Sequence, residues 1–257
     1  MADIKTILST LNAITEKNSF DVYIPSLKRE VKFKPLSTKQ QQSFYSCAID
    51  TIPFNTRFVI TTFEAITENC YEPDIISQLT TIDRLVILLA LRKNTLGADL
   101  AIVKNDTLYT GTLNDCLKNA KAITIPDSKT VEVKNIRVLL STPLMVDQYG
   151  VEKALRENIN IKMSPDELLK QAVLCETSKI VKSISVINED KVTDLGYNQL
   201  NYKDRLAVIE SLPAEIMLEV QQYVSQITEI TNSLLTVNIS DDATAIIDIT
   251  VDFFLSS

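Results

Sequence analysis

The sequence feature that most constrains the fold is an apolar stretch from Leu79 to Arg92. Thr80, followed three residues later by Asp83, has the spacing of a capping box, which predicts the first turn of a helix. Beyond this cap, apolar residues occupy nearly every face, and a helix of that kind belongs inside a core. We therefore predict a central buried helix at about 80–93, followed by Gly97 in a left-handed cap. The uninterrupted apolar run is far shorter than the roughly 18 to 20 residues that cross a bilayer, so we expect no membrane span.

Composition and charge narrow the classes of function. The chain has 257 residues, 45% of them hydrophobic, which suffices for a sizeable core in one large domain or two smaller ones. Its formal net charge of -7 argues against a nucleic acid partner, because affinity for a phosphate backbone comes mostly from Lys and Arg. Residues 1–14 lack the continuous apolar centre of a signal peptide. We therefore expect a protein that is made and kept in the cytosol.

The side chains of the common enzyme classes are missing. The sequence has no histidine, the residue that most often serves as a base or metal ligand near neutral pH. Its glycines are isolated, which excludes a glycine-rich phosphate loop, and no serine precedes a lysine by three residues. The cysteines lack the paired spacing of a zinc or redox site, so we expect buried thiols at Cys47, Cys70, Cys116 and Cys175. We predict no enzyme, no catalytic residue, no cofactor and no metal site.

The patterns along the chain indicate an α+β fold, in which mixed helices accompany small antiparallel sheets and hairpins. Residues 1–18 form an N-terminal amphipathic helix, and residues 19–97 a hairpin with a helical subdomain. Residues 98–142 form a small β subdomain with strands at 98–104, 107–112, 122–125, 130–134 and 136–140, although 113–120 could be helical. Residues 143–257 form a helical and β C-terminal part. A single continuous domain is the alternative to this division.

Two helix signals stand out in the C-terminal part. The sequence Ser164-Pro-Asp-Glu combines a capping serine, a proline at the first helical position and acids near the positive end of the helix dipole. After Pro213, apolar residues recur at steps of four and three, as in a short coiled-coil seam: Ile216, Val220, Tyr223, Ile227, Ile230 and Leu234. The seam is under three heptads, so we expect packing within the chain. Two strands, 235–239 and 245–251, are predicted to follow.

Two apolar segments at the chain ends are the candidate partner-binding sites. Ile4, Ile7 and Leu11 lie on one stripe of the N-terminal helix, which docks either on the chain's own body or on a neighbouring subunit. Phe253, Phe254 and Leu255 lie at the C-terminal tip, where large apolar groups need a cover. That cover is either another protein or the chain's own core.

Short motifs along the chain resemble the baseplate hub assembly proteins of T-even-type contractile-tailed bacteriophages. The opening is similar at Ile-Pro-Ser (24–26) and at Val-Lys-Phe-Lys-Pro-Leu-Ser-Thr-Lys-Gln (31–40). Ala65–Cys70, Leu79–Arg92 and Asn94–Gly97 follow in the family's order and at similar spacing. Ile209–Pro213 and Asp252-Phe253-Phe254 resemble its closing signature. The resemblance runs from about Phe20 to Phe254.

This resemblance implies a structural or assembly protein of the baseplate hub, which acts by protein-protein contacts with other phage tail and baseplate proteins. The implied location is the host cytoplasm during assembly. The resemblance is compatible with a protein that stays in the virion or one that leaves before completion, and with an oligomer within the assembly. Relatives carry cysteine pairs in two hairpins that resemble metal clips, whereas here Val103–Thr107 and Ile239–Ala243 contain no cysteine. The resemblance therefore carries no zinc site over to this chain.

A second hypothesis comes from the acidic residues near the C-terminus. Asp241 and Asp242, with Asp248 and Asp252, are among the densest acidic groups of the chain. Carboxylates of this kind could serve an acidic calcium-dependent module or a small hydrolase. They do not match the EF-hand pattern, so solvated turns are the simpler interpretation.

Overall fold

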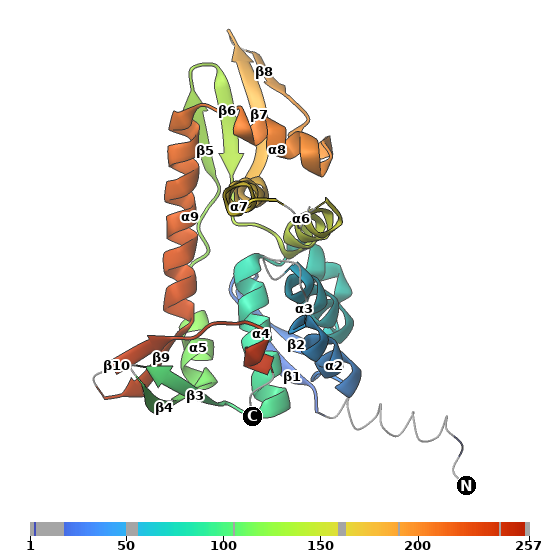
Figure 1. Ribbon diagram of the computed structural model, residues 1–257, viewed down its shortest axis with the longest axis vertical. Helices are drawn as coiled ribbons and strands as arrows, with labels where there is room; N and C mark the ends of the chain where they lie inside the picture. The colour runs from blue at the N-terminus through green and yellow to red at the C-terminus, as the bar shows by residue number, and fades with distance from the viewer. Residues whose placement is uncertain are drawn as a thin grey trace.

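The structure is a computed structural model that describes residue 3 and residues 18–49, 56–104, 106–158, 163–189, 191–241 and 243–254. Figure 1 shows an elongated molecule with two bodies. We call the described residues from 18 to 120, together with 235–254, the lower body, and residues 129–140 with 163–212 the upper body. Helices α6 (Met145–Asn158) and α9 (Ala214–Leu234) link the two. The fold is α+β, as predicted.

The predicted central helix is α4 (Thr81–Leu96), and it lies at the centre of the lower body. Thr80 and Asp83 form the capping box, in which the Asp83 carboxylate also accepts from the backbone N–H of Ser26 at 3.0 Å. Residues 86 to 92 are all buried, which confirms the prediction of a helix covered on nearly every face. The helix stops before Gly97 as expected, but Gly97 has φ +100° and ψ 169°. That conformation is not a left-handed helical cap, although it is just as restricted to glycine.

The hairpin and helices that pack around α4 also follow the sequence pattern. The antiparallel hairpin turns Val22, Ile24, Val31 and Phe33 inward. Ser37 and Gln40 form the capping box of the next helix. The bounds of these elements are β1 (Phe20–Ile24), β2 (Arg29–Phe33), α2 (Thr38–Cys47), α3 (Thr56–Asn69) and the 3-10 helix η1 (Pro73–Gln78).

The middle of the chain differs from the prediction of one small sheet. Strands β3 (Asp99–Lys104) and β4 (Thr107–Thr112) form a separate hairpin in the lower body. Strands β5 (Lys129–Val133) and β6 (Ile136–Leu140) belong to the four-stranded sheet of the upper body. Between them lies helix α5 (Leu113–Ala120), which was the predicted alternative. The strand predicted at 122–125 is wrong, since these residues have no regular structure.

The upper body is an antiparallel sheet in the order β5-β6-β7-β8. Helix α7 (Pro165–Ile180) begins at the predicted capping serine, Ser164, whose hydroxyl accepts from the backbone N–H of Glu167. The remaining elements are β7 (Val181–Asn188), β8 (Lys191–Asp194), the 3-10 helix η2 (Tyr197–Gln199) and α8 (Tyr202–Glu210).

Helix α9 carries the predicted apolar seam and joins the two cores. Ile216, Val220 and Tyr223 are buried in the upper core, whereas Leu234 is buried in the lower core, and Ile227 packs against both. The seam is therefore used within the chain. The chain then returns to the lower body through β9 (Thr236–Ser240), β10 (Ala243–Ile246) and η3 (Asp252–Phe254). The second predicted strand is wrong beyond Ile246, because only 243–246 pair with β9.

Candidate functional site

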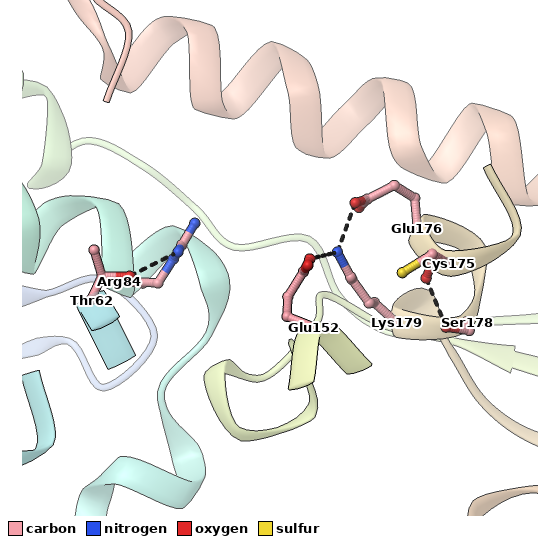
Figure 2. Close-up of polar contacts among 7 residues, drawn as sticks. All are labelled: Thr62, Arg84, Glu152, Cys175, Glu176, Ser178 and Lys179. Atoms are coloured by element: carbon pink, nitrogen blue, oxygen red, sulfur yellow. Dashed lines mark hydrogen bonds and ion pairs between the residues drawn. The ribbon is translucent and has the colours of Figure 1, made fainter. Parts of the chain in front are cut away.

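Charged side chains gather where the lower body meets the upper body (Figure 2). The Lys179 ammonium, at the end of α7, lies 2.6 Å from a Glu152 oxygen on α6 and 2.7 Å from a Glu176 oxygen. Lys179 and Glu152 expose only 2% and 5% of their side chains, whereas Glu176 exposes 65%. The Arg84 guanidinium of α4 donates to the Thr62 hydroxyl at 3.2 Å. We call Arg84, Glu152, Glu176 and Lys179 the junction cluster.

In the junction cluster, burial and the neighbouring opposite charges shift the pKa values of the two cations in opposite directions. Burial lowers the pKa of Arg84 to about 10, although Glu152 and Glu176 act in the opposite direction. Burial alone would also lower the pKa of Lys179, but Glu176 and Glu152 outweigh it and raise that pKa. Both cations are therefore protonated at neutral pH. One Glu152 oxygen and the Arg84 Nε are buried and have no hydrogen-bond partner among the described residues.

The thiol and the amine at this junction are poor nucleophiles. The Cys175 thiol lies beside the cluster, and burial raises its pKa to about 12, so it stays protonated at neutral pH. Burial likewise raises the pKa of Tyr202. Lys179 is held as an ammonium and has no free electron pair for attack. The arrangement is suited to holding helices α4, α6 and α7 together, and a stacked pair between α3 and α6, Phe63 and Tyr149 at 4.3 Å, adds an apolar contact nearby.

A groove of about 540 Å³ lies where the lower body meets the segments that connect it to the upper body. Its walls are the turn between β1 and β2, the irregular residues 123–128 and residues 141–144. The Ser26 hydroxyl there is buried, and within the described part of the chain it has no hydrogen-bond partner. Two backbone hydrogen bonds lie next to the groove in sequence: Thr81 N–H donates to the Pro143 carbonyl at 2.9 Å, and Met145 N–H to that of Leu79 at 2.7 Å. They fasten the start of α6 to the lower body.

The acidic residues near the C-terminus do not converge on a metal-binding geometry. Within the described ranges, no three His, Cys, Asp or Glu side chains are close enough to hold an ion, and Asp242 lies outside those ranges. All four cysteines are buried, as predicted. No described helix has the length and apolar character needed to cross a membrane.

The structure places two of the candidate partner-binding residues inside the lower core. The ring of Phe254 stacks on Phe44 with centroids 4.5 Å apart, and Phe253 and Phe254 are 6% and 5% exposed. The Arg92 Nε donates to the Phe253 carbonyl at 3.0 Å. The chain's own core therefore covers both rings, which was the alternative to cover by another protein. Little of their surface is left for a partner. Ile4, Ile7, Leu11 and Leu255 lie outside the described residues.

A more accessible apolar surface lies on the hairpin β3–β4, and the sequence analysis missed it. Val103 and Leu108 pair across the strands and expose 72% and 69% of their surface. With their exposed neighbours Ala101 and Thr110 they form what we call the hairpin face. The apolar run 100–103 could have indicated this surface, because a strand that is apolar on both sides requires a cover on both sides.

The opposite side of this hairpin is packed tightly on the lower body. Gly111 permits the close approach: a Cβ there would lie 2.6 Å from the Ile102 side chain and 3.1 Å from that of Val237. The hairpin is therefore anchored on strand β9 through its inner side. Its apolar outer side, the hairpin face, is presented to solvent on a fixed support.

One of three comparisons with known proteins gave a match. The chain matches the profile of the family described as T4 bacteriophage base plate protein over residues 16–255, which covers both bodies and both linking helices. Comparisons with curated proteins and with solved structures gave no match. Because the family match extends over nearly the whole sequence, the chain belongs to the family of T4 bacteriophage base plate proteins.

Proposed function

We propose that this protein is a structural and assembly protein of the baseplate hub, and that it acts through contacts with other baseplate proteins. Membership of the baseplate family supports a role within the phage baseplate. The absence of histidine from the sequence, and the protonated, buried state of Cys175 and Lys179, support a role without bond-making chemistry. We propose that these contacts form in the host cytoplasm and persist in the finished tail.

The observation that carries the proposal is the exposure of the Val103–Leu108 pair. Fully burying an aliphatic side chain of this size stabilises a structure by about 1.5–3 kcal/mol relative to leaving it in water. A hairpin fixed at Gly111 cannot turn these side chains inward without losing its packing on Val237. A partner that covers the hairpin face therefore gains this stabilisation on binding, without first reordering the hairpin.

Co-expression with the other baseplate proteins of the same phage tests the proposal. We expect the full chain to purify in a stable complex with at least one of them. The double variant Val103→Thr/Leu108→Thr places β-branched residues, which suit strands, at both positions but removes apolar surface, and we expect it to lose that complex with an unchanged melting temperature. The control is Val192→Thr, which alters a valine that is 45% exposed on β8 at the other end of the molecule.

Two results would contradict the proposal. The first is a wild-type chain that stays alone in every combination. The second is a double variant that retains the complex as well as the Val192→Thr control does. Mass spectrometry of purified particles tests persistence, since we expect the chain to be present in finished tails.

A further inference from the structure

The C-terminal fifth of the chain has an unusual charge distribution. From Leu206 to Ser257 there is no lysine or arginine, whereas the same residues include eight acids: Glu210, Glu215, Glu219, Glu229, Asp241, Asp242, Asp248 and Asp252. This segment therefore has a formal charge of -8, compared with -7 for the whole chain, so the rest is nearly neutral. The acidity of this protein is concentrated in one segment.

The fold places the middle of this segment, helix α9 and the hairpin β9–β10, along one side of the molecule. Helix α9 runs along the left margin of Figure 1, from the upper sheet down to the hairpin β9–β10. Its inner side carries the buried seam, whereas its outer side is exposed at Glu215, Leu218, Gln222, Gln226 and Glu229. These five residues recur at steps of three and four, so they form one stripe. Glu215 and Glu229 lie about 21 Å apart along the helix.

Nearby cations neutralise only part of this side. Glu219 lies 2.5 Å from the Lys129 ammonium, and Glu210 is paired with Lys170. The exposed carboxylates of Glu215, Glu229 and Asp241 have no Lys or Arg nitrogen within 4.0 Å in the part of the chain that the structure describes. Lys104 lies near the lower end, where its ammonium donates to the Thr244 carbonyl at 2.8 Å. The charge of α9's outer stripe is therefore uncompensated.

Apolar surface accompanies these carboxylates. Leu218 is 58% exposed within the stripe, and Ile246 is 54% exposed at the lower end. A groove of about 430 Å³ lies between the two hairpins and is lined by Ile102, Val103, Lys104, Thr244, Ala245 and Ile246. Because Val103 also belongs to the hairpin face, the groove connects α9's side of the molecule with the contact surface proposed above.

We propose that the outer stripe of α9 and the adjoining β9–β10 hairpin, which we call the acidic flank, dock a lysine- and arginine-rich face of another baseplate protein. This inference rests on the proposed function and names the chemistry of the partner. Opposite charge steers the encounter, and Leu218 with the groove supplies apolar contact once the surfaces meet. A second copy that used the same flank would bring carboxylates against carboxylates, which opposes association.

Binding at two salt concentrations tests this proposal on the full chain. The probes are the other baseplate proteins of the same phage, each purified singly and measured by biolayer interferometry in 50 mM and 300 mM NaCl. The test variant is Glu215→Gln/Glu229→Gln/Asp241→Asn. The control variant, Asp21→Asn/Glu64→Gln/Asp74→Asn, removes the same charge from exposed carboxylates of the lower body.

We expect one probe with a basic surface to bind the wild-type chain and the control variant with the same rate constants. For the flank variant we expect an association rate about tenfold lower at 50 mM salt, and a smaller loss of rate between the two salt concentrations. Circular dichroism and melting temperature should not distinguish the variants, because all the altered side chains are exposed.

Three outcomes would overturn the inference. If a probe binds but the flank variant is indistinguishable from the control, the proposed function stands and the acidic flank is not the contact. If no probe binds the wild-type chain, both the proposed function and this inference fall. If sedimentation velocity shows that the wild-type chain self-associates and the flank variant does not, the occupant is a second copy.

Discussion

The lower body and the junction are held together by different forces. In the lower body, α4 is surrounded by apolar side chains, and its buried Asp83 accepts hydrogen bonds from Thr80 and Ser26. At the junction, the buried Lys179 and Glu152 depend on each other, and some polar atoms nearby have no partner. Apolar packing tolerates small losses, whereas a buried charge whose partner is removed is strongly destabilising. The relative placement of the two bodies is therefore the more vulnerable part of this fold.

The largest effect is expected from breaking the junction pair. Lys179→Ala leaves Glu152 buried without its cation and should lower the free energy of unfolding by about 3–5 kcal/mol in urea titrations. The matched control is Lys170→Ala, which breaks an exposed pair with Glu210 and should cost under about 1 kcal/mol. Replacing Lys179 and Glu152 together with methionine should recover most of the loss. Equal effects of the two single variants would mean that the junction pair is not coupled to stability.

A somewhat smaller effect is expected in the lower core. Leu88 is 0% exposed in the middle of α4, and Leu88→Ala should destabilise the protein by about 3 kcal/mol through lost burial and a residual cavity. Leu169 is 65% exposed on α7, and Leu169→Ala should alter the free energy of unfolding by no more than about 0.5 kcal/mol. Thermal unfolding followed by circular dichroism measures both. Similar shifts for the two variants would refute the central placement of α4.

Alkaline pH gives a third comparison, because each region contains one strongly shifted thiol. Burial raises the pKa of Cys116 in the lower body and of Cys175 near the junction to about 12, from an ordinary value of 9.0. Between these values the unfolded chain releases the thiol proton and the folded chain keeps it. Each thiol therefore makes its full contribution to the free energy of unfolding below about pH 9. That contribution falls as the pH rises, by about 2–3 kcal/mol per thiol at pH 11.

Urea unfolding at pH 7, 9 and 11 measures this dependence. Cys116→Ala and Cys175→Ala should each show a shallower loss of stability between pH 9 and pH 11 than the wild-type chain. If either variant follows the wild-type pH curve, its thiol titrates alike in both states and is not buried as the structure has it.

The smallest effect is expected at the helix caps. Thr80→Ala removes a buried capping hydroxyl from α4, and Ser164→Ala removes an exposed one from α7. Each should cost about 0.5–2 kcal/mol in chemical denaturation, with the larger value at Thr80 because Asp83 loses a buried donor there. A larger loss at Ser164 would reverse this ranking of the two regions.

Features that depend on local pattern were predictable. The central helix, the capping residues Thr80 and Ser164, the first hairpin and the seam of α9 all depend on residue spacing within one element. Spacing fixes which side chains share a face, and the apolar face is then buried wherever the element packs. Local chemistry therefore sufficed for these elements.

Features that depend on distant contacts were not predictable. Lys179 and Glu152 are 27 positions apart, and in sequence both resemble ordinary solvated charges on helices. Strands β5 and β6 look no different from β3 and β4, and only pairing with β7 assigns them to another sheet. Phe254 packs on Phe44 and Phe58, which are far away in sequence, and Phe253 packs on Phe254; no local pattern indicates these contacts.

Hydroxyl-radical footprinting of side chains, on the chain alone and within the assembled hub complex, tests the central claim most directly. We expect Leu108 on the hairpin face and Leu218 on the acidic flank to react readily in the free chain and to become protected in the complex, whereas Leu169 on α7 should keep its reactivity. Unchanged reactivity of Leu108 and Leu218 within a complex that contains the chain would contradict the claim that these surfaces are where the protein works.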